Sequence, residues 1–310
     1  MRTGNLILCF VNNFRIIIVI IKEKIFYMSK YVPDSTTKLW VVIASTRTDR
    51  GENNHQKSHG CIFCEGHEHF SPQEVYRLGP GHPNTPEWHV RVLQNKYPIT
   101  DIHEVVIHSP DHEKDFEQFT HVQSERVITV FKDRFNEHKN AGQVLIFNNH
   151  GLHAGASQTH PHSQIAVFPR QIELGMLARQ AVQNGVLETQ YFNVYCPDFS
   201  QWPYEVWIAP HKKETIFGNV DENEIADLSL ILKRVTRALS HIYLTAEMFA
   251  KVDRHLHPFG YNFYIYPHKE WYLRIIPRFV HPGGIELSTS LTVNVVDPTD
   301  AATELREFVL

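Results

Sequence analysis

Cysteine is scarce in this chain, with 4 residues in 310. Small secreted folds held together by disulfides are much richer in cysteine, so the sequence excludes that class. Two of the cysteines stand as Cys61-Ile62-Phe63-Cys64, and a gap of two residues suits the ligands of a shared metal better than a disulfide. These features predict a reducing, cytoplasmic environment.

Long apolar runs are also missing. The most apolar stretch lies within residues 1–27, where Asn12, Asn13 and Arg15 interrupt it, and neither part reaches the roughly 18 residues that a membrane span needs. The composition changes abruptly at Met28, so we expect translation to begin there and residues 1–27 to be a disordered extension or no part of the native protein.

Excess charge of one sign is absent as well. The formal net charge is −4, which excludes the strongly basic surface of a nucleic-acid-binding protein. We therefore expect neither nucleic acid nor a membrane as a partner.

What the chain does contain is an internal repeat. The segments EVVIHSPDHEKDF (104–116) and EVWIAPHKKETIF (205–217) each combine a strand, a proline and a basic turn. Apolar residues at helical spacing then predict one helix over 114–138 and a second over 221–243. Asp221 and Glu224 form a plausible capping pair at the start of the second helix.

Two further strands follow each predicted helix. They read QVLIFNN and SQIAVFPR in the first copy and YNFYIYP and YLRIIPR in the second. The sequence therefore predicts an α+β fold built from a duplicated unit, in which each copy is an antiparallel sheet crossed by a long helix. Residues 28–188 are the predicted N-terminal catalytic domain and residues 189–310 the C-terminal domain.

A histidine-rich loop occurs in only one copy, as NNHGLHAGASQTHPHSQIAVFPR (148–170). When the two copies are aligned on their shared Pro-Arg ending, Glu270 stands opposite His162 and Tyr272 opposite Gln164. Histidines kept for packing would be expected in both copies. The asymmetry therefore favours an active site in the first half.

The spacing within this loop suits phosphoryl chemistry. In an extended HSQIAV strand, His160, His162 and Gln164 point to one side. Gly151 and Gly155 let the backbone approach a phosphate closely, and a neutral imidazole can attack phosphorus and leave again.

Cys61 and Cys64 predict a zinc site completed by two histidines from later in the chain. A redox pair or two buried thiols are the alternatives. Spacing alone does not choose the histidines, since nine compete: His55, His59, His67, His69, His108, His112, His150, His153 and His160.

An ordered set of motifs resembles the galactose-1-phosphate uridylyltransferase family, a branch of the histidine-triad superfamily. The segments occur in the family's order: DSTTKLWVVIASTRTDR, CIFC, VRVLQNKYP, VVIHSPDH and HPHSQ. The resemblance covers residues 34–170 well and the second half more loosely. It implies a histidine-triad-like fold and transfer of a nucleotidyl group between a nucleotide sugar and a sugar phosphate.

The resemblance also implies roles for individual residues. His162 would be the nucleophile that forms a nucleotidyl-imidazole, and Gln164 would hydrogen-bond the transferred phosphoryl group. A structural Zn²⁺ would be held by Cys61, Cys64, His112 and His160. Nucleotide and phosphate contacts would come from Arg47, Arg50, Asn95, Asn149 and Ser157.

The substrate is less closely specified. Hydrolases of the superfamily carry a histidine where this chain has Gln164, and a glutamine is neither an acid nor a base, so transfer is favoured over hydrolysis. We expect UMP to move between a UDP-sugar and a hexose 1-phosphate, with an ADP-sugar or dinucleoside-polyphosphate phosphorylase as the alternative. A zinc-stabilised nucleotide-binding protein without turnover is the alternative from another class.

The sequence departs from the family's usual pattern at two places. The family's second metal pair is replaced here by Tyr272-Leu273-Arg274, so that second site is expected to be absent. Ser163 stands where uridylyltransferases commonly have glycine, which is similar to adenylyl-transferring relatives. The sequence itself does not give the oligomeric state; related enzymes are dimers, which makes a homodimer one candidate assembly.

Overall fold

The computed structural model describes residues 7–11, 14–18, 29–34, 36–37, 39–44, 47, 60–246 and 258–309. Its first half contributes strands β5 (Glu74–Leu78), β6 (Val90–Gln94), β7 (Ile102–Ile107), β8 (Gln143–His150) and β9 (His162–Phe168). The second half contributes β10 (Gly185–Glu188), β11 (Phe192–Tyr195), β12 (Val206–Pro210), β13 (Tyr261–Ile265) and β14 (Leu273–Pro277).

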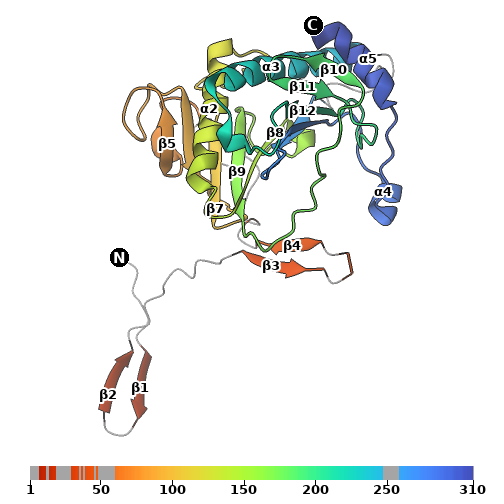
Figure 1. Ribbon diagram of the computed structural model, residues 1–310. Coiled ribbons are helices and arrows are strands. Elements are labelled where there is room, and N and C mark those ends of the chain that lie inside the picture. The colour runs from red at the N-terminus through yellow and green to blue at the C-terminus, as the bar shows by residue number, and fades with distance from the viewer. Residues whose placement is uncertain are drawn as a thin grey trace.

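These strands form one 10-stranded antiparallel sheet in the order β10-β11-β12-β14-β13-β8-β9-β7-β6-β5 (Figure 1). From one edge to the centre the strands run β10, β11, β12, β14, β13, and from the other edge they run β5, β6, β7, β9, β8. The two halves therefore have the same connectivity. The halves meet where β13 pairs with β8, with Tyr264 opposite Phe147. The predicted α+β fold, a duplicated unit with an antiparallel sheet and long crossing helices, is confirmed.

The position of β10 bears on the proposed domain boundary. β10 pairs only with β11 in the sheet order, so it belongs to the second copy. A boundary after residue 188 would separate these two strands. We therefore move the proposed boundary to the connection between β9 and β10, residues 169–184.

Two long helices, α2 (His121–His138) and α3 (Glu222–Thr245), pack on one face of the sheet, and α5 (Pro298–Val309) packs beside α3 and β10 (Figure 1). Asp221 caps α3 in a reciprocal capping box with Glu224, as predicted. Shorter helical segments are η2 (Glu68–Phe70), η3 (Leu152–Ala154), η4 (Phe217–Asn219) and α4 (Gly284–Thr289).

The prediction that the first helix begins at residue 114 is wrong. Phe116 and Phe119 are buried at helical spacing, but they lie in a turn before α2. The side chain of Asp115 accepts a hydrogen bond from the backbone N–H of Phe116, and Thr120 caps the helix by accepting from the N–H of Gln123. Local side-chain bonds thus hold the turn in place of a first helical stretch.

Two hairpins precede the sheet: β1 (Ile7–Val11) with β2 (Phe14–Ile18), and β3 (Lys30–Pro33) with β4 (Trp40–Ile43). Most of residues 1–28 lie outside the described residues, so the prediction about an extension is not tested there. No helix in the described ranges is both long and apolar enough to cross a membrane.

The two faces of the sheet differ in what covers them. Along β9, Ile165 and Val167 face the main core formed with α2 and α3. Because side chains alternate along a strand, His162 and Gln164 face the other way. That second face is covered near His162 by the Cys61–Cys64 loop, which packs in a separate apolar cluster. The strand alternation therefore places the predicted nucleophile away from the helices.

Candidate active site

The ring of His162 is held in one orientation and one tautomer. Its Nδ1 lies 2.9 Å from the backbone carbonyl oxygen of His160, and a carbonyl only accepts, so Nδ1 carries the proton and donates. The lone pair of the neutral ring is then on Nε2. Phe63 packs edge-on against the ring at 5.5 Å between centroids, and the Nδ2 of Asn148 donates to the His162 carbonyl at 3.0 Å. Ring and backbone are both fixed.

Four side chains that the family resemblance grouped as metal ligands come together next to His162. They are Cys61, Cys64, His112 and His160, and their ligand atoms all lie within 4.8 Å of one another. The segments that supply them are far apart in the sequence. Among the described residues this is the one group of at least three histidine, cysteine or acidic side chains that can hold a metal ion.

The distances within this group fit tetrahedral coordination. Zn–S bonds of about 2.3 Å and Zn–N bonds of about 2.0 Å put sulfur and nitrogen ligands roughly 3.6 Å apart. The Sγ of Cys64 lies 3.3 Å from Nδ1 of His112 and 3.6 Å from Nδ1 of His160, and the Sγ of Cys61 lies 3.7 Å from the same His160 nitrogen. The residues present therefore fit a four-coordinate metal.

Hydrogen bonds outside this group orient one of its ligands. The Nε2 of His160 donates to the carbonyl of Ser109 at 2.8 Å, which leaves the Nδ1 lone pair facing the cysteines. Burial lowers the pKa of His160 to about 4, so the ring is neutral. Burial, together with the neighbouring Cys61, raises the pKa of Cys64 to about 12, and a bound cation would oppose that rise by stabilising the thiolate.

Gln164 is hydrogen-bonded to two side chains from the β6–β7 region. Its Oε1 accepts from Nδ2 of Asn95 at 3.2 Å and lies 3.0 Å from Nε2 of His103. Asn95, which the resemblance assigned to the nucleotide, is thus in contact with Gln164. Arg47 reaches the same turn, where its Nη1 donates to the carbonyl of Tyr97 at 2.8 Å.

The other predicted contact residues lie in and after β8. Asn149 is half-buried, and its Oδ1 accepts from Nδ2 of Asn262 on β13 at 2.8 Å. Ser157 is half-buried in the connection between η3 and β9. Arg50 lies outside the described residues. The half of the molecule that lacks the histidine loop therefore still contributes Asn262 to the support of the site.

A buried polar network lies behind β9, on its helix side. His108 contacts Asp115 through Nδ1 at 2.9 Å and Ser163 through Nε2 at 2.8 Å, and Asp115 also contacts His150 at 2.9 Å. Burial alone would raise the pKa of Asp115, but the charges and hydrogen bonds of the two histidines lower it below its usual range. Asp115 and His108 together therefore link the end of β7 to β8, through His150, and to β9, through Ser163 next to His162.

The corresponding place in the second half holds an ion pair. The guanidinium of Arg274 contacts both carboxylate oxygens of Glu205, at 2.7 and 2.8 Å, and both side chains are buried. The positively charged guanidinium thus occupies the place of the family's second metal pair, and the absence of a second metal site stays a prediction.

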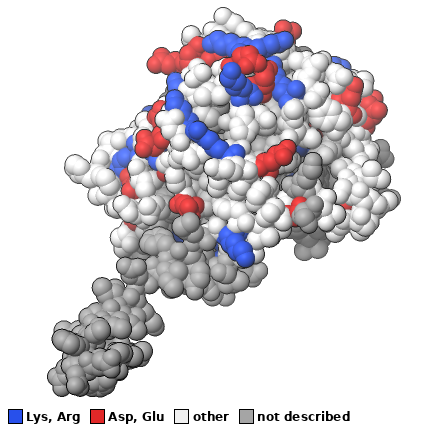
Figure 2. All heavy atoms as spheres, turned by 60° about the horizontal axis from the view of Figure 1, so that its bottom comes forward, with Lys and Arg blue, Asp and Glu red and all other residues white. Residues whose placement is uncertain are grey.

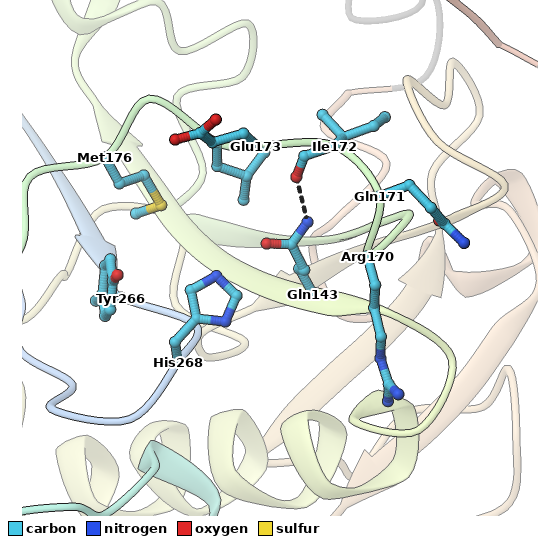
Figure 3. A pocket seen from close by; sticks show the side chains of 9 residues that line it. Gln143, Arg170, Gln171, Ile172, Glu173, Met176, Tyr266 and His268 are labelled. Atoms are coloured by element: carbon cyan, nitrogen blue, oxygen red, sulfur yellow. Dashed lines mark hydrogen bonds between the residues drawn. The ribbon is translucent and has the colours of Figure 1, made fainter.

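A hollow of about 370 Å³ lies elsewhere, at the far end of β8 (Figure 3). Gln143 lies against it and donates through Nε2 to the carbonyl of Ile172 at 2.7 Å, while Tyr266 and His268 line the opposite side. Along β8, Gln143 is five residues from the strand position beside Ser163, or about 17 Å. None of the predicted site residues lines this hollow.

Charge is mixed over the face of the molecule drawn in Figure 2, where acidic and basic side chains lie close together with uncharged surface between them. Among the described residues drawn there, neither sign of charge forms an extended field.

Sequence reasoning missed Phe63, His103 and Asn148. Phe63 stands inside the CIFC motif, and Asn148 directly precedes the predicted contact residue Asn149. Both residues are therefore adjacent in the sequence to predicted site residues. His103 had only strand alternation to mark it, since it shares the face of Val105 and Ile107 on β7.

Comparison with known proteins shows which family this chain resembles. Residues 95–167 match the model of the galactose-1-phosphate uridyl transferase N-terminal domain. The chain is 26% identical over 339 residues to the ADP-glucose phosphorylase of Arabidopsis thaliana, which covers 89% of this chain and 92% of that protein. It is 25% identical over 232 residues to a galactose-1-phosphate uridylyltransferase of Thermotoga maritima, covering 66% of this chain and 73% of the relative.

Solved structures of such proteins are similar to this chain in fold. An ADP-glucose phosphorylase from Arabidopsis thaliana with bound ADP-glucose matches with a TM-score of 0.65 at 25% identity, over 90% of this chain and 99% of that one. A uridylyltransferase structure matches with a TM-score of 0.68 at 20% identity, over 91% and 98% of the two chains, which shows the shared fold. The predicted resemblance to the galactose-1-phosphate uridylyltransferase family is confirmed.

Proposed function

We propose that this chain, a relative of the galactose-1-phosphate uridylyltransferases, is a nucleotidyltransferase in which Nε2 of His162 carries the nucleotidyl group between two substrates. The observation that carries the proposal is the hydrogen bond from Nδ1 of His162 to the His160 carbonyl. That bond puts the lone pair on Nε2, and a neutral imidazole with an oriented lone pair is a suitable nucleophile.

The reaction would run in two displacements. Nε2 of His162 attacks the α-phosphorus of a nucleotide sugar, the P–N bond forms, and the bond to the sugar-phosphate oxygen breaks with its electron pair. The sugar phosphate then leaves, and a phosphate oxygen of the acceptor attacks the same phosphorus as the P–N bond breaks. A phosphate leaving group needs no proton at neutral pH, so Gln164 is sufficient where a hydrolase uses a histidine.

Gln164 would stabilise the charge that develops on the transferred phosphoryl group. An amide N–H aimed at that position is worth more in the transition state than in water. Arg47, Arg50, Asn149 and Ser157 would bind the nucleotide and its phosphates, with the guanidinium groups suited to phosphate oxygens.

We propose Zn²⁺ as the metal held by Cys61, Cys64, His112 and His160, because two thiolates and two imidazoles at these spacings suit zinc. Four protein ligands leave no open position, so the ion would supply structure and no reacting group. His160 is then anchored two residues before His162, and its carbonyl holds the nucleophilic ring.

Two nucleotide sugars are candidates for the donor. Transfer of UMP between a UDP-sugar and a hexose 1-phosphate is supported by the family resemblance and by the similarity to a galactose-1-phosphate uridylyltransferase of Thermotoga maritima. An ADP-sugar phosphorylase is supported comparably, because the relative of that name matches over 89% of this chain. In that case inorganic phosphate would be the acceptor, and ADP and a hexose 1-phosphate the products.

Isotope exchange tests this proposal and separates the two donors. Labelled glucose 1-phosphate is incubated with UDP-glucose or with ADP-glucose and no other acceptor. A covalent carrier predicts that label enters the nucleotide sugar, and the nucleotide that supports exchange identifies the base. His162→Ala should abolish exchange, so exchange at the normal rate in that variant would overturn the proposal. A nucleotide-binding protein without turnover would show no exchange of label, either in the wild type or in His162→Ala.

A further inference from the structure

The amide of Gln164 is the polar group whose orientation the proposed transfer depends on most. An amide can be turned by half a rotation with almost no change in shape, and only its hydrogen bonds decide whether oxygen or nitrogen faces a ligand. Here Oε1 is directed at Asn95 and His103, at 3.2 and 3.0 Å. What fixes those two neighbours therefore fixes Gln164.

Backbone N–H groups fix both neighbours. The N–H of Ile99 donates to Nδ1 of His103 at 3.1 Å, so in the neutral ring the proton of His103 is on Nε2. The N–H of Tyr97 donates to Oδ1 of Asn95 at 2.8 Å, so the Nδ2 end of Asn95 faces Gln164. A backbone N–H never accepts, and neither assignment can be reversed without losing a bond.

Two donors consequently converge on one oxygen. Nδ2 of Asn95 and Nε2 of His103 lie 3.3 Å apart because both point at Oε1 of Gln164. If the amide of Gln164 were turned around, its NH₂ group would face two N–H donors and all three would lose their partners. His103 and Gln164 are both buried, where unpaired donors are costly.

We infer that His103 is a positioning residue that, with Asn95, holds the carboxamide of Gln164 with its oxygen toward β7 and its NH₂ group toward the transferred phosphoryl group. The inference rests on the proposed function for its catalytic consequence. Within the described part of the chain, no protein group accepts from Nε2 of Gln164, so its N–H bonds are available to a ligand. In this account His103 does not touch the substrate and affects the reaction through Gln164.

Three variants separate this role from a structural one. His103→Phe keeps a ring but removes the donor to Gln164, and it should lower kcat of the first half-reaction about tenfold with little change in KM. His103→Gln supplies a donor in the position of Nε2 and should recover most of that rate. Thr100→Val is the matched control, because Thr100 is buried in the same turn and donates only to the Ile102 carbonyl; it should leave the rate unchanged.

A double-mutant cycle tests whether the effect passes through Gln164. In a Gln164→Ala background, His103→Phe should cause no further loss, since there is no amide left to orient. A further tenfold loss there, or a normal rate for His103→Phe alone, would overturn the inference. Absence of any nucleotidyl transfer by the wild-type chain would instead contradict the proposed function.

A measurement that needs no turnover completes the test. In protein labelled with ¹⁵N-histidine, the resonances that disappear in His103→Gln belong to His103, and their shifts report which ring nitrogen is protonated. The inference requires the Nε2–H tautomer. Finding the Nδ1–H tautomer in the wild-type chain would overturn it, whatever the enzyme's activity.

Discussion

His160 and His162 are separated by one proline, and their ring nitrogens contact different groups. Nδ1 of His160 faces the two cysteines, whereas Nδ1 of His162 donates to the chain itself. His162→Ala should therefore abolish transfer and leave metal content unchanged, whereas His160→Ala should lower both. Metal analysis beside an activity assay checks this, and loss of metal in His162→Ala would contradict the separation of roles.

Gln164→Glu changes the chemistry of this side chain while keeping its shape, because it replaces the amide nitrogen by an oxygen. Asn95 and His103 would still donate to one oxygen, so the variant should fold with a normal metal content. The other oxygen would face the phosphoryl group as a negatively charged acceptor in place of a donor. Transfer should fall about 10²-fold or more. A rate within threefold of the wild type would show that Gln164 does not contact the reacting group.

An ion pair joins Arg274 on β14 to Glu205, the residue directly before β12. Arg274→Met would leave Glu205 buried without its cation, which typically costs about 3–5 kcal/mol of unfolding free energy. Denaturant unfolding should detect the loss, and the folded protein should keep its metal. A loss under about 1 kcal/mol would mean that the pair is not buried in solution.

Some of the strands and helices could be predicted from the sequence, and others could not. Strands that alternate apolar and polar residues, and a helix with a capping box at Asp221, were predictable from local pattern. The start of α2 was not, because Phe116 and Phe119 satisfy helical spacing while Asp115 is held by His108 and His150 from other strands. A bond made by tertiary contact is not visible in local periodicity.

At the candidate site, the role of His103 also depends on tertiary contacts and could not be predicted from the sequence. Motif resemblance named residues that bear the chemistry, whereas His103 supports Gln164 from a neighbouring strand and has no motif of its own. The duplicated sheet was predictable because the two copies repeat in order. The domain boundary stays a proposal, because residues 169–184 contain no strand or helix that would mark it.

The proposed zinc joins three segments that are distant in the chain. A ligand that binds the folded state and not the unfolded one stabilises the fold. Chelation, or Cys61→Ala, should lower the melting temperature by several degrees and reduce activity. Cys196→Ala is the matched control, because Cys196 is also a buried free cysteine but lies outside the metal group; it should retain the metal. A purified wild-type chain that holds no metal and melts normally in chelator would contradict the structural role.

The central claim is a covalent nucleotide on His162, and intact-protein and peptide mass spectrometry tests it most directly. The chain is mixed with UDP-glucose or ADP-glucose without an acceptor, stopped above neutral pH to preserve an acid-labile P–N bond, and digested. The account predicts one added nucleoside monophosphate on the peptide that contains His162, removed by hexose 1-phosphate or phosphate and absent in His162→Ala. Turnover without any adduct, or an adduct on another residue, would contradict it.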